Sequence, residues 1–78
     1  MMLKIPNRVI VDSDLYELRI RYCNVDKPAN PVFEWKMGYY YTDPYGNERI
    51  LVSMRGKNFA DVENSMLSYL SNNKIETE

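Results

Sequence analysis

Residues 33–41 alternate between apolar and mostly polar or small side chains, and a turn signal follows them directly. The run reads FEWKMGYYY, and the turn signal is Asp43-Pro44-Tyr45-Gly46-Asn47. A period of two residues is that of a β-strand with one face buried and the other in contact with water. The chain is therefore expected to form a sheet with one open face, and its function depends on the side chains that this face carries.

Three other segments are expected to complete an antiparallel sheet. Residues 15–23 and 48–55 alternate in the same way, and residues 8–11 form a shorter strand. Residues 12–14 are polar and typical of a turn, while residues 24–32 contain two prolines, which disfavour helix in the residues before them. Consecutive strands joined by short links pair as a meander.

The C-terminal part of the chain is expected to be a helix over residues 59–71. Asn58 precedes it as a preferred N-cap residue, and Asp61 lies in the first turn, where the helix dipole favours negative charge. The outer side of the helix is expected to carry Asp61 and Glu63, and residues 73–78 are typical of a frayed polar tail. Apolar side chains recur at the three- and four-residue steps of one helix face: Phe59, Val62, Met66, Tyr69 and Leu70.

These elements predict a single small α+β domain over residues 1–78. Its antiparallel sheet has three to four strands in a meander, and the one C-terminal helix packs on one face of the sheet because its apolar stripe needs an apolar surface to cover. A chain of 78 residues buries only about 60–65% of the surface that its unfolded form exposes. An enclosed active site is therefore not expected.

The composition excludes several kinds of chemistry. The chain has no histidine, so Cys23 lacks the usual partner of a catalytic thiol, and Ser–His triads and His-based metal sites are ruled out. Asp12 and Asp14 fit a turn, and Glu17 and Glu34 are not expected to do acid–base work on an open face. We therefore expect no enzyme, catalytic residue, cofactor or metal.

The location is expected to be cytoplasmic. A single cysteine cannot form an internal disulfide, which fits a reducing compartment. The sequence shows no signal-peptide pattern, and no apolar run approaches the length of about 20 residues that a membrane span needs. No membrane partner is therefore expected.

The register between the third and fourth strands can be read in two ways. The Asp-Pro-x-Gly turn favours a three-residue loop with a left-handed Gly46, which pairs Tyr41 with Arg49. A four-residue loop instead aligns Ile50 with Tyr41 and keeps one face uniformly apolar. Burial of three apolar side chains, those of residues 50, 52 and 54, outweighs turn preference, so the four-residue register is the prediction.

This register assigns side chains to the two faces of the sheet. Trp35 is expected to anchor the core, and the helix is expected to cover Tyr16, Leu18, Ile20, Tyr22, Phe33, Trp35, Met37, Tyr39, Tyr41, Ile50, Val52 and Met54. The open face is expected to carry the cations Arg19, Arg21, Lys36, Arg49 and Arg55, the acids Glu17 and Glu34, and Tyr40 and Leu51 near its middle. A chain of net charge −1 is thus predicted to be polarised, with a basic open face.

The predicted function is that of a non-enzymatic binding module that uses this basic face. The expected partner is RNA, with Arg and Lys side chains on phosphates and Tyr40 stacking on a base, or an acidic protein surface. The abundance of Asn, Tyr, Ile, Lys and Phe is typical of AT-rich coding and suggests a small phage-type regulator or inhibitor of host machinery. One alternative is a structural or assembly protein that forms a homodimer through the same face, around Tyr40 and Leu51. Another is an ordinary solvated face, on which Glu34 offsets Arg19 or Arg21.

Overall fold

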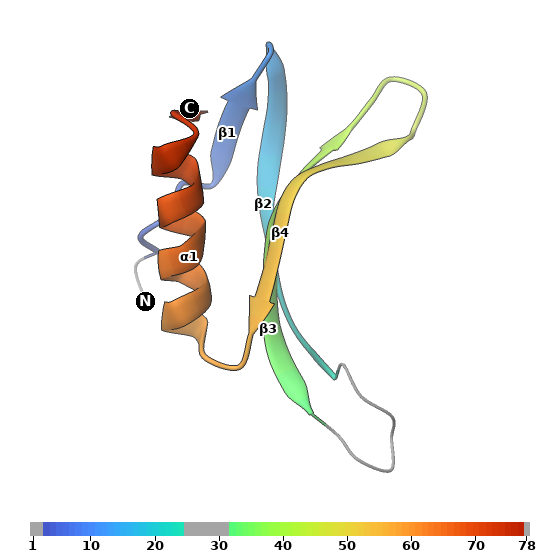
Figure 1. The fold of residues 1–78 in the computed structure, drawn as a ribbon. Helices are drawn as coiled ribbons and strands as arrows, with labels where there is room; N and C mark the ends of the chain where they lie inside the picture. Colours follow the sequence, from blue (N-terminus) through green and yellow to red (C-terminus); the bar gives the residue numbers. More distant parts are fainter. Residues whose placement is uncertain (1–2, 25–31, 78) are drawn as a thin grey trace.

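The computed structural model describes residues 3–24 and 32–77. Its elements are β1 (Arg8–Val11), β2 (Asp14–Asn24), β3 (Phe33–Thr42), β4 (Glu48–Gly56), α1 (Phe59–Asn72) and β5 (Glu76–Thr77). The strands form one antiparallel sheet in the order β4-β3-β2-β1-β5, and α1 covers one face of it while the other face stays open (Figure 1). The predicted α+β meander with one C-terminal helix is confirmed. No helix in the described ranges is long and apolar enough to cross a membrane.

Both ends of α1 are capped by local hydrogen bonds. The Asn58 side chain accepts a hydrogen bond from the backbone N–H of Asp61 at 3.3 Å, as expected of an N-cap. At the other end the N–H of Lys74 donates to the carbonyl of Ser71, and the N–H of Ile75 donates to that of Leu70. With Lys74 at a φ of 51°, this is the Schellman arrangement that reverses the chain after a helix.

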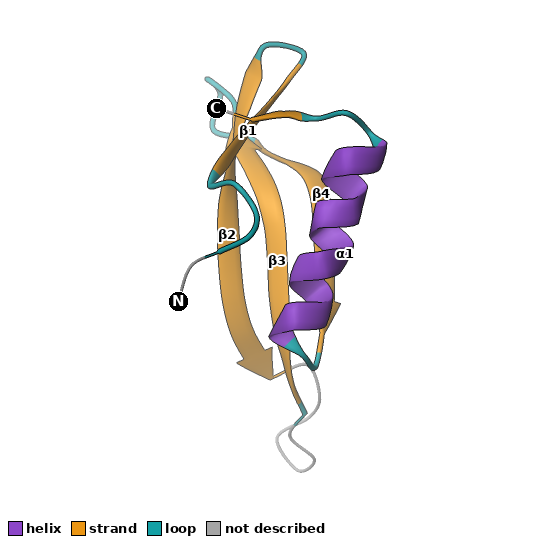
Figure 2. Cartoon of the chain, turned by 90° about the vertical axis from the view of Figure 1, so that its left-hand side faces the viewer, coloured by secondary structure: helices purple, strands orange, loops and turns teal. Residues whose placement is uncertain are grey.

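The prediction of a frayed tail over residues 73–78 was wrong for residues 73–77, which the structure describes. The reversal at Lys74 returns the chain to the sheet, where Val9 pairs with Thr77 and Ile10 pairs with Glu76 (Figure 2). Ile75 packs against the core on the way. This edge strand was hard to predict because the C-terminal helix cap uses a lysine where glycine is usual.

The core lies between the sheet and α1, and its centre differs from the prediction. Met37 and Tyr39 on β3, Val9 on β1 and Met66 on α1 are fully buried. The hydroxyl of Tyr39 donates a hydrogen bond of 2.8 Å to the carbonyl oxygen of Pro6, which ties the segment before β1 to the sheet. Trp35 faces α1, as predicted, but is only half-buried, so the prediction that it anchors the core was wrong.

Glu63 also differs from its predicted position on the outer side of α1. It is buried, and its carboxylate accepts a hydrogen bond of 2.8 Å from the backbone N–H of Lys4. A buried carboxylate needs such a partner, because burial without one costs the desolvation free energy of the charge. The N-terminal segment thus supplies a donor that helical periodicity alone could not reveal.

The β3–β4 register combines the two alternatives through a β-bulge. Met37 pairs with Met54 and Tyr39 with Val52, as the four-residue register predicts, whereas Tyr40 pairs with Ile50 and Tyr41 with Arg49, as the three-residue loop predicts. Leu51 is the extra residue of β4 and packs against the core. Bulges bend a strand and increase its twist, and the β3–β4 hairpin curls away from α1 beyond this point (Figure 1).

Burial of Tyr39 predicts a loss of stability in alkali. Desolvation raises the pKa of its hydroxyl from 10.0 to about 12. The folded-state pKa is higher than that of the unfolded chain, so the contribution of Tyr39 to the free energy of unfolding is complete below about pH 10. It is lost as the pH rises towards 12, by up to about 1.4 kcal/mol per pH unit. Urea unfolding of Tyr39→Phe, which lacks the ionisable group, should show a shallower decline over this range. Equal slopes for the two proteins would contradict the prediction.

Candidate binding surface

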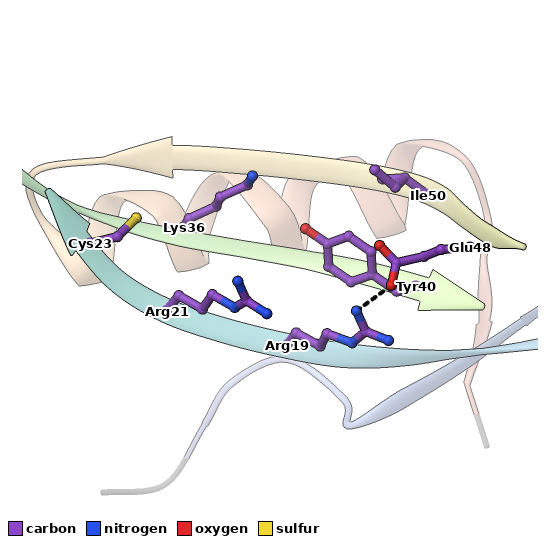
Figure 3. Close-up of a pocket in the computed structure, with 7 residues that line it drawn as sticks. All are labelled: Arg19, Arg21, Cys23, Lys36, Tyr40, Glu48 and Ile50. Atoms are coloured by element: carbon purple, nitrogen blue, oxygen red, sulfur yellow. Dashed lines mark hydrogen bonds and ion pairs between the residues drawn. The ribbon is translucent and has the colours of Figure 1, made fainter. Parts of the chain in front are cut away.

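The bent open face of the sheet forms a shallow hollow of about 240 Å³. Its walls come from β2, β3 and β4, and Figure 3 shows the lining side chains rising from one side of these strands, away from α1. The lining residues are Arg19, Arg21, Cys23, Lys36, Tyr40, Glu48 and Ile50. Four of the six residues predicted for binding line this hollow, namely Arg19, Arg21, Lys36 and Tyr40.

Three cations lie directly opposite one another across the open face. Arg21 on β2 pairs with Lys36 on β3, and Lys36 pairs in turn with Arg55 on β4. We call these three residues the cation row. Directly opposed residues in an antiparallel sheet share a face, with Cβ atoms about 4.5–5.5 Å apart, and like charges in such positions repel.

No carboxylate of the described residues offsets this repulsion by ion pairing. Within residues 3–24 and 32–77 the structure contains no ion pair to Arg21, Lys36 or Arg55. The expected compensation of Arg21 by Glu34 is therefore not formed. The row is an unneutralised strip of positive charge about 10 Å long, given the strand spacing of about 4.8 Å.

Arg19, the fourth cation of the open face, is held differently. Its guanidinium lies 2.6 Å from a carboxylate oxygen of Glu48 and 4.7 Å from the centre of the Tyr40 ring (Figure 3). Both charged side chains remain well exposed, so this ion pair adds at most about 1 kcal/mol to stability. Glu48 offsets the charge of Arg19, and Arg19 occupies a position over the Tyr40 ring.

The position of the Tyr40 ring also depends on Gly38. Gly38 lies beside it on β3, and a Cβ atom built on Gly38 would be 2.9 Å from Cε2 and 3.0 Å from the hydroxyl of Tyr40. The tyrosine side chain therefore extends over the glycine. Tyr39 and Tyr41 point towards the core and only Tyr40 lies on the open face, as predicted, but its ring is already in contact with Arg19 and Gly38.

The bulge at Leu51 changes which residues of β4 reach the open face. Arg49 pairs with Tyr41, which packs against the core, so the assignment of Arg49 to the open face was wrong. Ile50 was expected in the core but lines the hollow and is 58% exposed, while Leu51 was expected on the open face but packs against the core. Glu48 joins the open face instead of Arg49. Among the described residues of β2, β3 and β4, the open face has four cations and three carboxylates rather than five and two.

Three lining residues were not predicted for binding, Cys23, Glu48 and Ile50, and the last two were missed because of the register. The signal that could have found these two is the Asp-Pro-x-Gly turn: Gly46 has a φ of 86°, and the N–H of Gly46 donates to the carbonyl of Asp43. This is the predicted turn with a left-handed glycine. The turn fixes the register near the hairpin tip, even though the apolar residues further along β4 favour a register that differs by one residue.

The Cys23 thiol and the two turn aspartates lie towards opposite ends of β2. Cys23 is a free, half-buried thiol at one end of the hollow, and Asp12 and Asp14 belong to the turn between β1 and β2. No group of three or more metal-ligating side chains occurs within the described ranges. What the hollow offers is a set of charged and apolar contacts on an open surface.

A second surface feature lies on the helix side of the sheet, beyond the region that α1 covers. Tyr22 stacks on Phe33 with ring centres 5.5 Å apart, Trp35 lies 4.7 Å from Tyr22, and Phe59 meets Trp35 edge-on at 5.0 Å. Tyr22 and Phe33 are 57% and 47% exposed. The face predicted for these aromatic residues was right, but their predicted burial was wrong.

Comparisons with known protein families, with curated proteins and with solved structures find no match to this chain. Any statement about its function must therefore come from the surface itself.

Proposed function

We propose that this chain is a non-enzymatic binding module that attaches to an acidic protein surface through its open sheet face, in the manner of a small regulator or inhibitor. The observation that carries the proposal is the cation row. Three opposed like charges reduce the stability of the sheet, and an anionic partner would remove that penalty on binding. A cytoplasmic location suits a chain whose only cysteine is a free thiol.

An acidic protein is favoured over RNA by the surroundings of the row. Single-stranded RNA is usually held by free aromatic faces as well as by phosphate contacts, and Tyr40 is already in contact with Arg19 and Gly38. Glu34 on the same face would oppose a continuous phosphate chain. A protein surface can instead place its carboxylates on the row and an apolar side chain on the exposed Ile50.

A titration with two polyanions tests the proposal. Labelled oligoglutamate peptide and labelled single-stranded oligouridine RNA are each titrated with the protein at low and high salt, and fluorescence anisotropy reports binding. We expect the peptide to bind at low salt and to weaken as salt rises, since exposed charges are screened. Binding of the RNA without binding of the peptide would make nucleic acid the partner and overturn the proposal. Binding of neither probe, with self-association in sedimentation, would favour the homodimer.

Substitution of Lys36, the central cation, should change binding and stability in opposite directions. Lys36→Gln should weaken the oligoglutamate complex by about tenfold, equivalent to about 1.4 kcal/mol. The same substitution should raise the free energy of unfolding by about 0.2–1 kcal/mol, because it removes repulsion from Arg21 and Arg55.

Arg49→Gln is the matched control, since Arg49 lies on β4 with its side chain on the other face. It should change the affinity by less than about twofold, as expected for a charge outside the contact. A purely structural role for Lys36 predicts loss of stability in Lys36→Gln and no selective loss of binding. Chemical denaturation and anisotropy, measured on the same samples, distinguish the two roles.

A further inference from the structure

The outer edge of β4 exposes backbone hydrogen-bonding groups. β4 is the last strand on its side of the sheet, so its outward backbone groups have no strand partner among the described residues. Such an edge can pair with an extended segment of another chain. The opposite edge, β5, contains only Glu76 and Thr77 and offers much less backbone.

A groove of about 450 Å³ runs beside this edge. Its lining residues in the described ranges come from the end of β4, from the connection that follows and from α1, with none from β3, so it opens at the outside of the sheet. The strand side is formed by residues 54–56, the connection by Lys57 and Asn58, and the helix side by Asp61, Val62 and Ser65. We call this the edge groove.

The edge groove has apolar walls and charges of both signs. Met54 and Val62 supply apolar contacts. Asp61 would repel a carboxylate placed beside it, and the charges of Arg55 and Lys57 are of the opposite sign. On the open face, a residue of an added strand that pairs with Arg55 would lie at the end of the cation row, next to that arginine. An acidic side chain is favoured at this outer position and an apolar one at the inner position.

The two preferences match the alternation of a β-strand, in which neighbouring side chains point to opposite faces. We infer that β4 accepts an added strand from its protein partner: an extended acidic segment in which Asp or Glu alternates with apolar residues. The acidic side chains extend the cation row and the apolar ones enter the edge groove. The bulge at Leu51 bends the edge, so the added strand pairs with residues 52–56. This inference rests on the proposed function and specifies its partner.

The test uses a labelled peptide of about seven residues that alternates glutamate and valine, a length that spans the pairing segment. A block peptide of the same composition, with all glutamates before all valines, is the control for charge alone. Two further versions carry backbone N-methyl groups on every glutamate or on every valine. Only one of these sets of N–H groups faces β4 in an added strand, because N–H groups alternate in direction along a strand.

Strand addition predicts that one N-methylated peptide binds at least about tenfold more weakly than the parent, while the other stays within about twofold. The block peptide should also lose affinity. On the protein side Arg55→Glu should abolish binding, whereas Arg49→Glu, which lies beyond the bulge on the same strand, should have little effect.

Two outcomes overturn the inference in distinguishable ways. If both N-methylated peptides and the block peptide bind as well as the parent and Arg55→Glu still abolishes binding, an acidic partner binds the cation row without strand pairing, and the proposed function survives alone. If no acidic peptide binds but oligouridine RNA does, the inference and the proposed function both fail.

Discussion

Gly38→Ala is expected to lower the free energy of unfolding by about 2–3 kcal/mol, at the upper end of the usual cost of overpacking. The added Cβ atom would lie 2.7 Å from the carbonyl oxygen of Val52, a backbone atom of the neighbouring strand that cannot move without disturbing the bulge. The nearby Tyr40 side chain can rotate away, but this backbone contact remains. Urea denaturation at neutral pH measures the change.

Gly46→Asn is the control for Gly38→Ala. Gly46 has a φ of 86° in the hairpin turn, and a Cβ atom there would meet nothing within 4 Å. Asparagine tolerates the left-handed conformation better than most residues, so the loss of stability should stay below about 1 kcal/mol. A Gly38→Ala protein as stable as Gly46→Asn would show that β3 and β4 do not approach each other as described at the bulge.

Met37→Ala is expected to lower the free energy of unfolding by about 2–5 kcal/mol and to exceed the effect of Trp35→Ala. Met37 is fully buried at the centre of β3, so its truncation leaves a cavity between the sheet and α1. Trp35 is larger but half-buried among Tyr22, Phe33 and Phe59 at the edge of the covered region. Truncation of a side chain that water already reaches leaves a smaller cavity.

The comparison of the two variants is made by chemical denaturation, with Tyr22→Ala as a third variant from the exposed cluster. Tyr22→Ala should cost less than Met37→Ala, because Tyr22 is 57% exposed. A larger loss for Trp35→Ala than for Met37→Ala would place the centre of the core at the aromatic cluster and contradict the packing described above.

Alternation and helical periodicity predicted the elements because each repeats over many residues. β2, β3 and β4 were expected within one or two residues of their bounds, and α1 begins at Phe59 as predicted and ends one residue later than predicted. The face of nearly every strand residue followed from the same period. The exception is the stretch from Glu48 to Leu51, where the bulge shifts the register.

Neither the turn preference nor the apolar pattern of β4 predicts that shift when it is used alone. Gly46 sets the register near the hairpin tip, and Val52 and Met54 set it near the core, and the two settings differ by one residue. The extra residue, Leu51, absorbs the difference. A single register along the whole of β4 places Arg49 on the open face and Ile50 in the core, as predicted, and both positions were wrong.

Depth of burial was the other quantity that alternation could not supply. A strand of 11 residues such as β2 is about 36 Å long, at about 3.3 Å per residue. The 14 residues of α1 span only about 21 Å, at 1.5 Å per residue. One helix therefore leaves part of the apolar face uncovered, and Tyr22 and Phe33 lie in that part.

The cation row was predictable by contrast, since Arg21, Lys36 and Arg55 lie on the core side of the bulge, where the chosen register was correct. What the sequence could not show is that the row lacks ion-pair partners in the described ranges while Arg19 has one. That difference depends on the position of Glu48, which the bulge determines. The candidate site thus rests on a pattern visible in the sequence and on a local irregularity that was not.

A backbone NMR titration of the isotope-labelled protein with the glutamate–valine peptide tests whether the cation row is the contact surface for an acidic protein partner. Binding at the cation row predicts that the largest chemical-shift changes occur at Arg21, Lys36 and Arg55 and along residues 52–56, and that Lys36→Gln needs about tenfold more peptide to reach them. Changes confined to the aromatic cluster of Tyr22, Phe33, Trp35 and Phe59, or unaffected by Lys36→Gln, would contradict it.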